Sequence, residues 1–185
     1  MASRIEDYGL IGDCETAALV GRDGSIDWLC WPAFDSDACF AALLGTSRNG
    51  RWLLAPAETI KRTSRRYRDD TLILETRFET NGGVVELIDF MPPRGHASDV
   101  VRLVRGISGR VKMHMELVIR FGFGVDVPWV KKNPDGGGLL AISGQDMTVL
   151  RTPVETRGKD LTTIADFEVG EGDTVPFVLT YGASF

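Results

Sequence analysis

The sequence predicts an all-β protein: an antiparallel β-sandwich of two sheets with about a dozen strands and one short helix near residues 36–45. Short runs of apolar or alternating residues recur along the chain, separated by turns rich in glycine, proline and aspartate. Only one short stretch has helical spacing. With 185 residues, 43% of them hydrophobic, the chain is long enough to bury a core as a single domain over residues 1–185.

The first expected hairpin joins residues 16–21 to residues 26–31. The turn at 22–25 contains Gly24, which can adopt the positive φ that a tight turn requires. Residues 36–45 follow as the short helix, because Asp35 or Ser36 can cap its start and a glycine can end it.

The middle of the chain continues with strands. Residues 52–56 form an apolar run that ends at a proline, and the basic run 61–68 fits a solvated edge strand whose charges discourage further pairing. An Asn-Gly-Gly turn at 81–83 joins the alternating runs 71–80 and 84–90. This turn makes the second hairpin the clearest in the sequence.

The last part of the chain has the same character. Glycine, proline and aspartate separate its short runs of apolar and alternating residues. The strands expected here are residues 100–105, 111–121, 127–131, 139–143, 147–152, 161–169 and 174–181.

Composition excludes several classes of protein. The formal net charge of −5 gives no electrostatic reason to expect a nucleic-acid partner. No apolar stretch approaches the roughly 20 residues that span a bilayer, so we expect no membrane partner. The amino terminus lacks a basic-then-apolar export signal, so we expect a cytoplasmic protein. The three cysteines match no metal-binding spacing, and we expect Cys14, Cys30 and Cys39 to be buried or half-buried thiols.

No catalytic apparatus stands out. Glycoside hydrolysis needs two cooperating carboxylates, but the acids at positions 75, 79, 86 and 89 fall on the polar positions of alternating strands, where solvated acids are common. His96 and His114 are isolated in the sequence. We therefore predict no catalytic residue, no metal site and no cofactor in this chain.

One segment nevertheless resembles a known family, the trehalase-like amino-terminal domain of glycoside hydrolase family 15, which includes glucoamylases, glucodextranases and trehalases. The resemblance is sharpest over residues 8–56 and continues more loosely to the end of the chain. The residues that carry it are Gly12, Asp13, Thr16, Ala18, Leu19, Val20, Asp23, Gly24, Ser25, Ile26, Asp27, Trp28, Leu29, Cys30, Pro32, Phe34, Asp35, Ser36, Phe40, Leu43 and Leu44.

The resemblance implies a function. Such proteins resemble two-part enzymes, in which a β-sandwich precedes an (α/α)6 barrel that holds both catalytic glutamates and hydrolyses α-glucosidic bonds with inversion. Nothing in this chain resembles that barrel. The resemblance therefore implies an inactive front domain that packs on the barrel and shapes the mouth of its active site, with an α-glucoside or trehalose as the enzyme's substrate.

Four residues are candidates for substrate binding or a domain interface: Trp31, Phe34, Asp35 and Asp27. Strand alternation from Trp28 places Trp31 on the opposite, exposed face, whereas Trp28 and Phe34 are more often core residues. Ala33 stands where the family pattern usually has arginine, which removes one charge from this loop. A domain interface left exposed would favour self-association.

The alternative function is a free-standing carbohydrate-binding or protein-interaction module. Weak sugar binding by the isolated chain would favour this alternative over the front domain of an enzyme.

Overall fold

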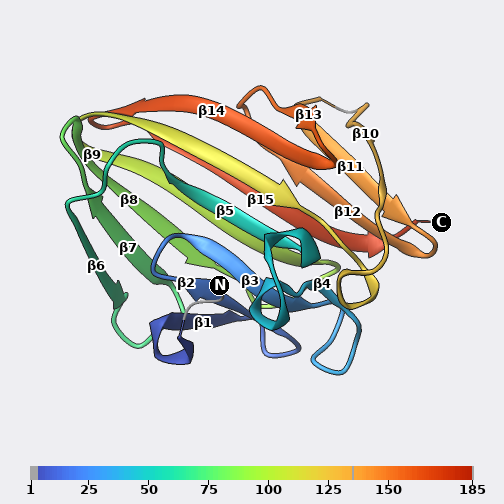
Figure 1. Cartoon of the computed structure of the whole chain (residues 1–185). Coiled ribbons are helices and arrows are strands. Elements are labelled where there is room, and N and C mark those ends of the chain that lie inside the picture. The colour runs from blue at the N-terminus through green and yellow to red at the C-terminus, as the bar shows by residue number, and fades with distance from the viewer. Residues whose placement is uncertain (1–3, 135, 185) are drawn as a thin grey trace.

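The protein is two antiparallel sheets packed face to face and joined by one long strand (Figure 1). The computed structural model describes residues 4–134 and 136–184. The long strand, β9 (Ser98–Val118), pairs with sheet B through its first half and with sheet A through its second half. The predicted all-β fold is confirmed.

Sheet A holds the second half of β9 between β5 (Arg51–Pro56) and β14 (Thr162–Gly170). Beyond β5 follow β3 (Ser25–Cys30), β2 (Ala17–Gly21) and the edge strand β1 (Tyr8–Gly12), and the short β4 (Ala38–Phe40) also pairs with β3. Beyond β14 lies β13 (Arg157–Lys159).

Sheet B holds the first half of β9 between β8 and β15. Beyond β8 follow β7 and the edge strand β6, and beyond β15 follow β12, β11 and the edge strand β10. The strands are β6 (Arg62–Tyr67), β7 (Leu74–Glu79), β8 (Gly83–Phe90), β10 (Trp129–Lys132), β11 (Gly138–Ser143), β12 (Asp146–Arg151) and β15 (Thr174–Ala183).

Both predicted hairpins are present, as β2–β3 and β7–β8. The strand prediction erred at β9, because residues 100–105 and 111–121 were expected as separate strands. The expected break at residues 106–109 is absent, because Gly106 and Gly109 allow β9 to continue through it as one strand. The described residues form 15 strands, against the expected dozen or so, since the short β1, β4 and β13 lack a clear sequence pattern.

The predicted helix at residues 36–45 is wrong. The segment forms β4 and a single 3-10 turn, η2 (Ala42–Leu44). All of β4 is buried, and Phe40 pairs with Leu29 of β3. A segment of two turns has little helical stability of its own, so burial and strand pairing decide its conformation.

The other short turns are also 3-10 turns. They are η1 (Ile5–Asp7), η3 (Ser47–Asn49) and η4 (Gly122–Gly124).

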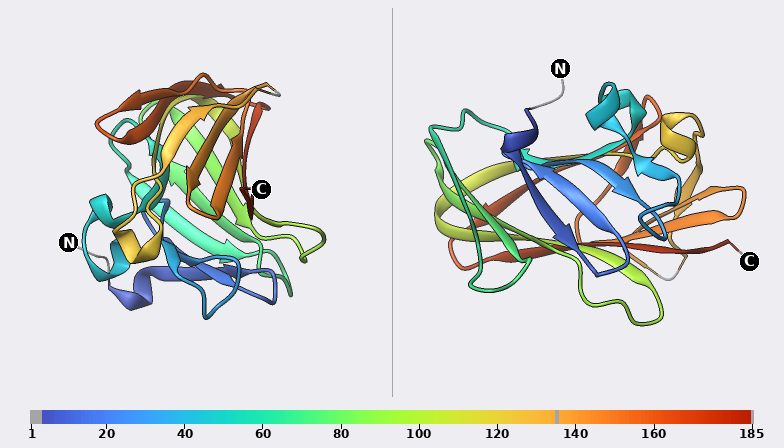
Figure 2. Two further views of the ribbon diagram at one scale, coloured as in Figure 1. Left: turned by 90° about the vertical axis from the view of Figure 1, so that its right-hand side faces the viewer. Right: turned by 90° about the horizontal axis from the view of Figure 1, so that it is seen from below.

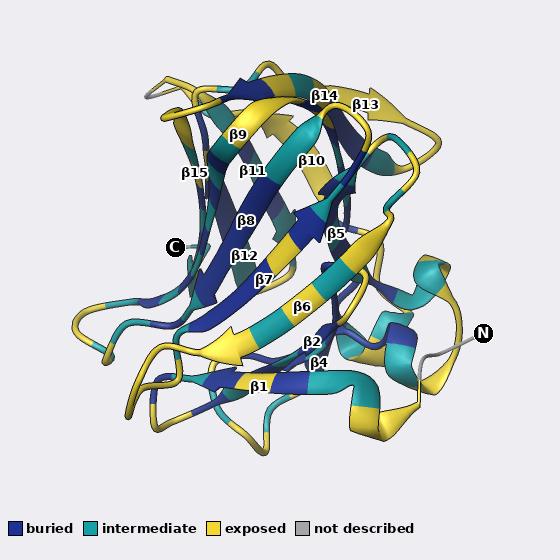
Figure 3. Ribbon diagram, turned by 90° about the vertical axis from the view of Figure 1, so that its left-hand side faces the viewer, coloured by how far each residue is buried: buried dark blue, intermediate teal, exposed yellow. Residues whose placement is uncertain are grey.

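The basic run 61–68 becomes the edge strand β6, as predicted. β6 pairs only with β7 and is largely exposed, whereas β8, on the other side of β7, is buried along most of its length (Figure 3). Arg66 and Arg68 both reach the buried carboxylate of Glu75 on β7, at 2.7 and 2.6 Å. The positive charges therefore cover a buried acid on the outer face of sheet B.

The two sheets are also joined by a buried arginine. Arg102 of β9 is fully buried and pairs with Asp89 of β8, with Nε 2.7 Å from the carboxylate. Its Nη1 and Nη2 donate across the core to the carbonyl oxygens of Trp52 (2.6 Å) and Gly24 (2.7 Å), both in sheet A. Gly24 has φ +83°, and a Cβ there would collide with the Leu54 carbonyl oxygen. The turn therefore needs glycine to bring its carbonyl to Arg102.

The expectation that the strand acids are solvated is wrong for three of them. Glu75, Glu86 and Asp89 are buried, and an arginine side chain contacts each one. Burial raises the pKa of Asp89, and the charge and hydrogen bonds of Arg102 oppose this shift. Alternation alone could not reveal this, since an arginine from a neighbouring strand can pair with an acid and bury it on either face of a sheet.

The loops at one end of the sandwich form a continuous surface, which we call the loop end. Phe34 N–H donates to the Glu15 carbonyl oxygen at 3.1 Å, which joins two neighbouring loops, and Arg120 N–H donates to that of Cys39 in β4 at 3.2 Å. The turns η2, η3 and η4 gather there (Figure 2). The loop end consists of residues 13–16, 31–37, 41–50, 91–97, 119–128 and 160–161.

We expect the substitution Arg102→Met to lower the free energy of unfolding by about 3–5 kcal/mol, because it leaves the Asp89 carboxylate buried and unpaired. Urea unfolding followed by circular dichroism measures this change. Arg62→Met on the exposed edge strand β6 is the matched control, with an expected change within about 0.5 kcal/mol. Equal effects of the two substitutions would contradict a structural role for Arg102.

Candidate functional site

A buried carboxylate organises one half of the loop end. Asp13 accepts hydrogen bonds from Nε and Nη2 of Arg94 (3.0 and 2.9 Å) and from Oγ of Ser98 (2.8 Å). Ser98 Oγ in turn accepts from the indole N–H of Trp31 at 2.9 Å, and Arg94 also pairs with Glu15 at 2.9 Å. We call Asp13, Glu15, Trp31, Arg94 and Ser98 the Asp13 cluster.

The local fold of residues 13–16 follows from the same aspartate. Asp13 Oδ1 accepts from the backbone N–H groups of Glu15 (3.0 Å) and Thr16 (2.9 Å), which is the short-range bonding that aspartate favours in turns. Cys14 adopts φ +74° inside this turn and is exposed, so the expectation that it is buried is wrong. Cys30 and Cys39 are buried as expected.

The electrostatics of the cluster favour a charged Asp13. Burial by itself would raise the pKa of this carboxyl, but hydrogen bonds from Ser98, Thr16, Glu15 and Arg94 outweigh burial and hold the pKa below its usual value of 3.8. Asp13 therefore remains an anion that ties the loops at 13–16 and 91–97 together.

The exposures expected for the aromatic candidates are reversed. Trp31 is buried, with 3% of its surface exposed, whereas Phe34 is 64% exposed. Trp28 is only half-buried, and its ring lies 6.3 Å from that of Phe123, outside the main core.

A bulge in β3 explains why Trp31, and not Trp28, faces the core. Leu19 pairs with Trp28 and Val20 with Ile26, which leaves Asp27 as an extra residue. One extra residue turns every later side chain to the opposite face, so Trp28 points outward and Trp31 inward.

The structure brings together Trp31, Phe34 and Asp35 but not Asp27. Phe34 and Asp35 are exposed on the loop that the Asp13 cluster supports. Asp27 is buried at the bulge, where its carboxylate accepts hydrogen bonds from Tyr8 (2.7 Å) and Ser25 (2.5 Å) at the starts of β1 and β3. This position is away from the loop end.

The other half of the loop end is apolar. Several large hydrophobic side chains there are about half or more exposed, and we call them the apolar rim. Its members are Phe123 (49%), Val125 (78%), Val127 (48%), Leu161 (72%) and Trp129 (76%), the last at the start of β10.

Sequence reasoning missed the apolar rim, because residues 127–131 were interpreted only as a strand. The signal that could have found it is the spacing of apolar residues over 123–129, with glycine, aspartate and proline between them.

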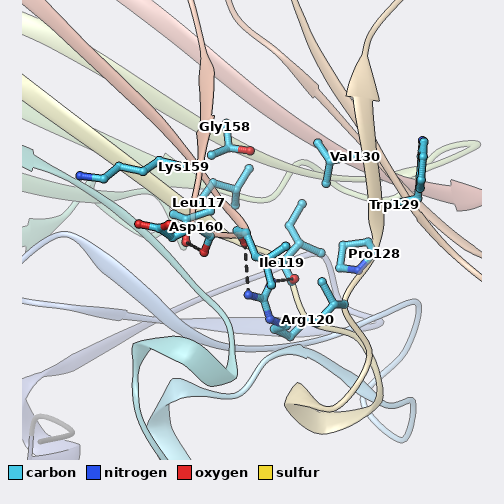
Figure 4. A pocket seen from close by; sticks show the side chains of 13 residues that line it. Leu117, Ile119, Arg120, Pro128, Trp129, Val130, Gly158, Lys159 and Asp160 are labelled. Carbon is cyan, nitrogen blue, oxygen red and sulfur yellow. Dashed lines mark hydrogen bonds between the residues drawn. The ribbon is translucent and has the colours of Figure 1, made fainter.

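A groove of about 380 Å³ opens beside the apolar rim (Figure 4). Leu117, Ile119, residues 127–130 and residues 158–163 line it. Arg120 lies in the groove, 8% exposed, and donates from Nη1 to the carbonyl oxygen of Ile119 (2.7 Å) and from Nη2 to that of Leu161 (3.2 Å). The groove thus combines apolar walls with a buried guanidinium.

Backbone strain accompanies this surface. Phe123 and Leu161 have φ of +57° and +59°, a region that costs a branched or bulky residue about 1–2 kcal/mol. Asp160 and Cys14 also have positive φ. The loop end therefore holds all of the described non-glycine residues with positive φ apart from Asp69. Such strain is often found at functional sites.

Among residues 4–134 and 136–184, no group of three or more histidine, cysteine, aspartate or glutamate side chains could hold a metal ion. No helix in these same ranges has the length and apolar character needed to cross a membrane.

Together, the fold and the loop end define a β-sandwich domain that presents a polar cluster and an apolar groove on one surface. The family model described as "Trehalase-like, N-terminal" matches residues 1–181. The chain belongs to this family, which confirms the resemblance seen in the sequence.

The chain is also similar to several trehalases. It is 32% identical to Trehalase of Thermoplasma volcanium over 72% of this chain and 22% of that protein. It is 30% identical to Trehalase of Mycolicibacterium smegmatis over 96% of this chain and 30% of that protein. For Trehalase 1 of Sulfolobus acidocaldarius the identity is 30%, over 82% of this chain and 26% of that protein. The matches thus span less than a third of each relative.

We expect Asp13→Asn to lower the free energy of unfolding at pH 7 by about 1.5–3 kcal/mol, because the hydrogen bonds to Arg94 and Ser98 lose their charged acceptor. The pKa of Asp13 is lowered in the folded protein, so its stabilising effect is present above the usual value of 3.8 and is lost as the pH falls below it.

The difference between wild type and Asp13→Asn should therefore shrink below about pH 4. Urea unfolding at pH 7 and at lower pH measures it. Asp35→Asn, on the exposed loop, is the control and should change stability by less than about 0.5 kcal/mol. A difference that grows on acidification would contradict this account of Asp13.

Proposed function

We propose that residues 1–185 are the non-catalytic N-terminal domain of a trehalase-like α-glucoside hydrolase of glycoside hydrolase family 15. Its loop end packs on an (α/α)6 catalytic domain and shapes the mouth of the active site. The observation that carries this proposal is the apolar rim, since an exposed group of large hydrophobic side chains marks an interaction surface. The family match and the greater length of the trehalases support it.

The carboxylates of this chain support a non-catalytic role. Hydrolysis with inversion needs an acid and a base about 6.5–9.5 Å apart that are free to transfer protons. Four of the buried acids, Asp13, Glu75, Glu86 and Asp89, are each bound by an arginine, which favours their charged, structural state. The fifth buried acid of the described residues, Asp27, accepts hydrogen bonds from Tyr8 and Ser25. The proposal therefore assigns both catalytic carboxylates to the partner domain.

The substrate of the whole enzyme, in this proposal, is trehalose or a related α-glucoside. Phe34 and Asp35 are exposed at the loop end, where they can contact the partner domain or a sugar, and Trp31 positions their loop from below. We place the enzyme in the cytoplasm, where the three free thiols of residues 1–185 stay reduced.

A second candidate function is a free-standing carbohydrate-binding or protein-interaction module. Trp129 favours it, because a tryptophan that is 76% exposed beside a groove can stack on one face of a sugar. The two functions differ in what the isolated chain does.

We expect the purified chain to show no turnover of trehalose or of p-nitrophenyl α-glucoside, because arginine, tyrosine or serine side chains hold the buried acids of the described residues and keep them from transferring protons. Glucose release and nitrophenol absorbance measure the two reactions. A longer protein that carries this chain together with its catalytic domain is the positive control. Turnover by residues 1–185 that a single Asp or Glu substitution abolishes would contradict the proposal.

We further expect the isolated chain to self-associate through the apolar rim and to leave maltose and trehalose unbound. Sedimentation velocity over a range of concentrations and calorimetric titration measure the two properties. Trp129→Ser should shift the chain toward monomer, because it removes the largest exposed side chain of the rim. Sugar binding by a monomeric chain, lost in Trp129→Ser, would instead establish the free-standing module.

A further inference from the structure

Arg120 is a buried cation without an acidic partner. Only 8% of its surface is exposed, and its guanidinium donates to two backbone carbonyls, those of Ile119 and Leu161. Within the described part of the chain, no carboxylate lies within ion-pair distance of this guanidinium. Arg102, which is also buried, pairs with Asp89 and shows how this fold otherwise compensates such a charge.

The energetic consequence is an uncompensated charge. Taking a guanidinium out of water costs several kcal/mol, which carbonyl dipoles offset less well than a full negative charge does. Burial accordingly lowers the pKa of Arg120, and no neighbouring acid opposes the shift. An anion brought to this position would therefore gain a strong, charge-assisted hydrogen bond.

The surroundings specify what kind of anion would bind. The groove beside Arg120 is lined by the apolar side chains of Leu117, Ile119, Val127 and Pro128 and by the largely exposed Trp129 and Leu161. Figure 4 shows Arg120 among several of these residues. A small hydrated ion would leave these apolar walls in water. A carboxylate carried on a protein segment with an apolar neighbour would pair with Arg120 and cover the walls at once.

A sugar fits this site less well than a carboxylate. Its hydroxyl groups are neutral, so a bound α-glucoside would leave the charge of Arg120 uncompensated. Charge complementarity therefore favours an acidic protein segment as the occupant.

We propose that the groove receives a segment of the catalytic domain in which an Asp or Glu carboxylate pairs with Arg120 and an adjacent apolar side chain packs against Trp129 and Leu161. This inference rests on the proposed function and names the contact through which the two domains dock. The trehalases extend well beyond the part that this chain matches, so such a segment lies in the remaining 70% or more of their length.

Zero-length cross-linking tests the pairing. In the longer protein that carries residues 1–185, Arg120→Lys supplies an amine that a carbodiimide can couple to a carboxylate in contact with it. We expect mass spectrometry to find an amide between position 120 and one Asp or Glu outside residues 1–185. Arg62→Lys, on the edge strand β6 away from the loop end, is the matched control and should give no such cross-link. Coupling of position 120 only to Asp160 or Glu116, or to no acid, would overturn the pairing.

Hydrogen exchange gives a readout that does not depend on the folding of Arg120→Lys. We expect amides in 119–130 and 157–163 to exchange at least about 10-fold more slowly in the longer wild-type protein than in the isolated chain. Trp129→Ser replaces an exposed residue, so it leaves the fold intact and should remove most of this protection.

The pattern of protection separates the two proposals. Protection of 31–37 and 91–97 without protection of 119–130 would leave the proposed function standing and overturn the docking groove. Equal exchange throughout the loop end in the two proteins would overturn both. Protection of the groove that appears only after trehalose is added would overturn the acidic segment and identify a glucoside as the occupant.

Discussion

The two sheets depend on one charged side chain in the middle of the core. Arg102 belongs to β9, yet its guanidinium donates to carbonyl oxygens of the opposite sheet and to Asp89 of its own sheet. These acceptors are fixed in space, so the arginine sets the relative position of the two sheets where apolar contacts alone would tolerate sliding. The guanidinium carbon of Arg102 also lies 5.2 Å from the centre of the Trp52 ring, so a cation–π contact adds to its interactions with sheet A. Trp52 is the largest fully buried side chain.

Much of the fold could be predicted from sequence, because two-residue alternation and glycine turns are local signals. The hairpins at 22–25 and 81–83 are examples. Features that depend on pairing across the molecule were not predictable. A bulge at Asp27 reverses the faces of Trp28 and Trp31, and nothing in the sequence around it marks an extra residue. Asp89 looked solvated because its arginine partner lies on another strand.

Of the loop end, only the part around residues 31–37 was predictable from the sequence. The resemblance led to the loop at 31–37, and the structure places Phe34 and Asp35 on the loop end. Arg120 and the apolar rim were missed, because they come from segments some 40 residues apart, as the 41-residue separation of Arg120 and Leu161 shows. Their significance depends on what surrounds each side chain, such as a missing counterion or an exposed tryptophan, and this information appears only after folding.

The place of β15 in sheet B has a consequence for biosynthesis. This strand follows all the other described strands in the sequence, but it lies between β9 and β12 and is the only described link from β10–β12 to the rest of their sheet. A ribosome must therefore release residues 174–183 before that sheet can close. Until then the nascent chain carries open hydrogen-bonding edges on β9 and β12, so the interval between making these strands and making β15 is when chaperones matter most.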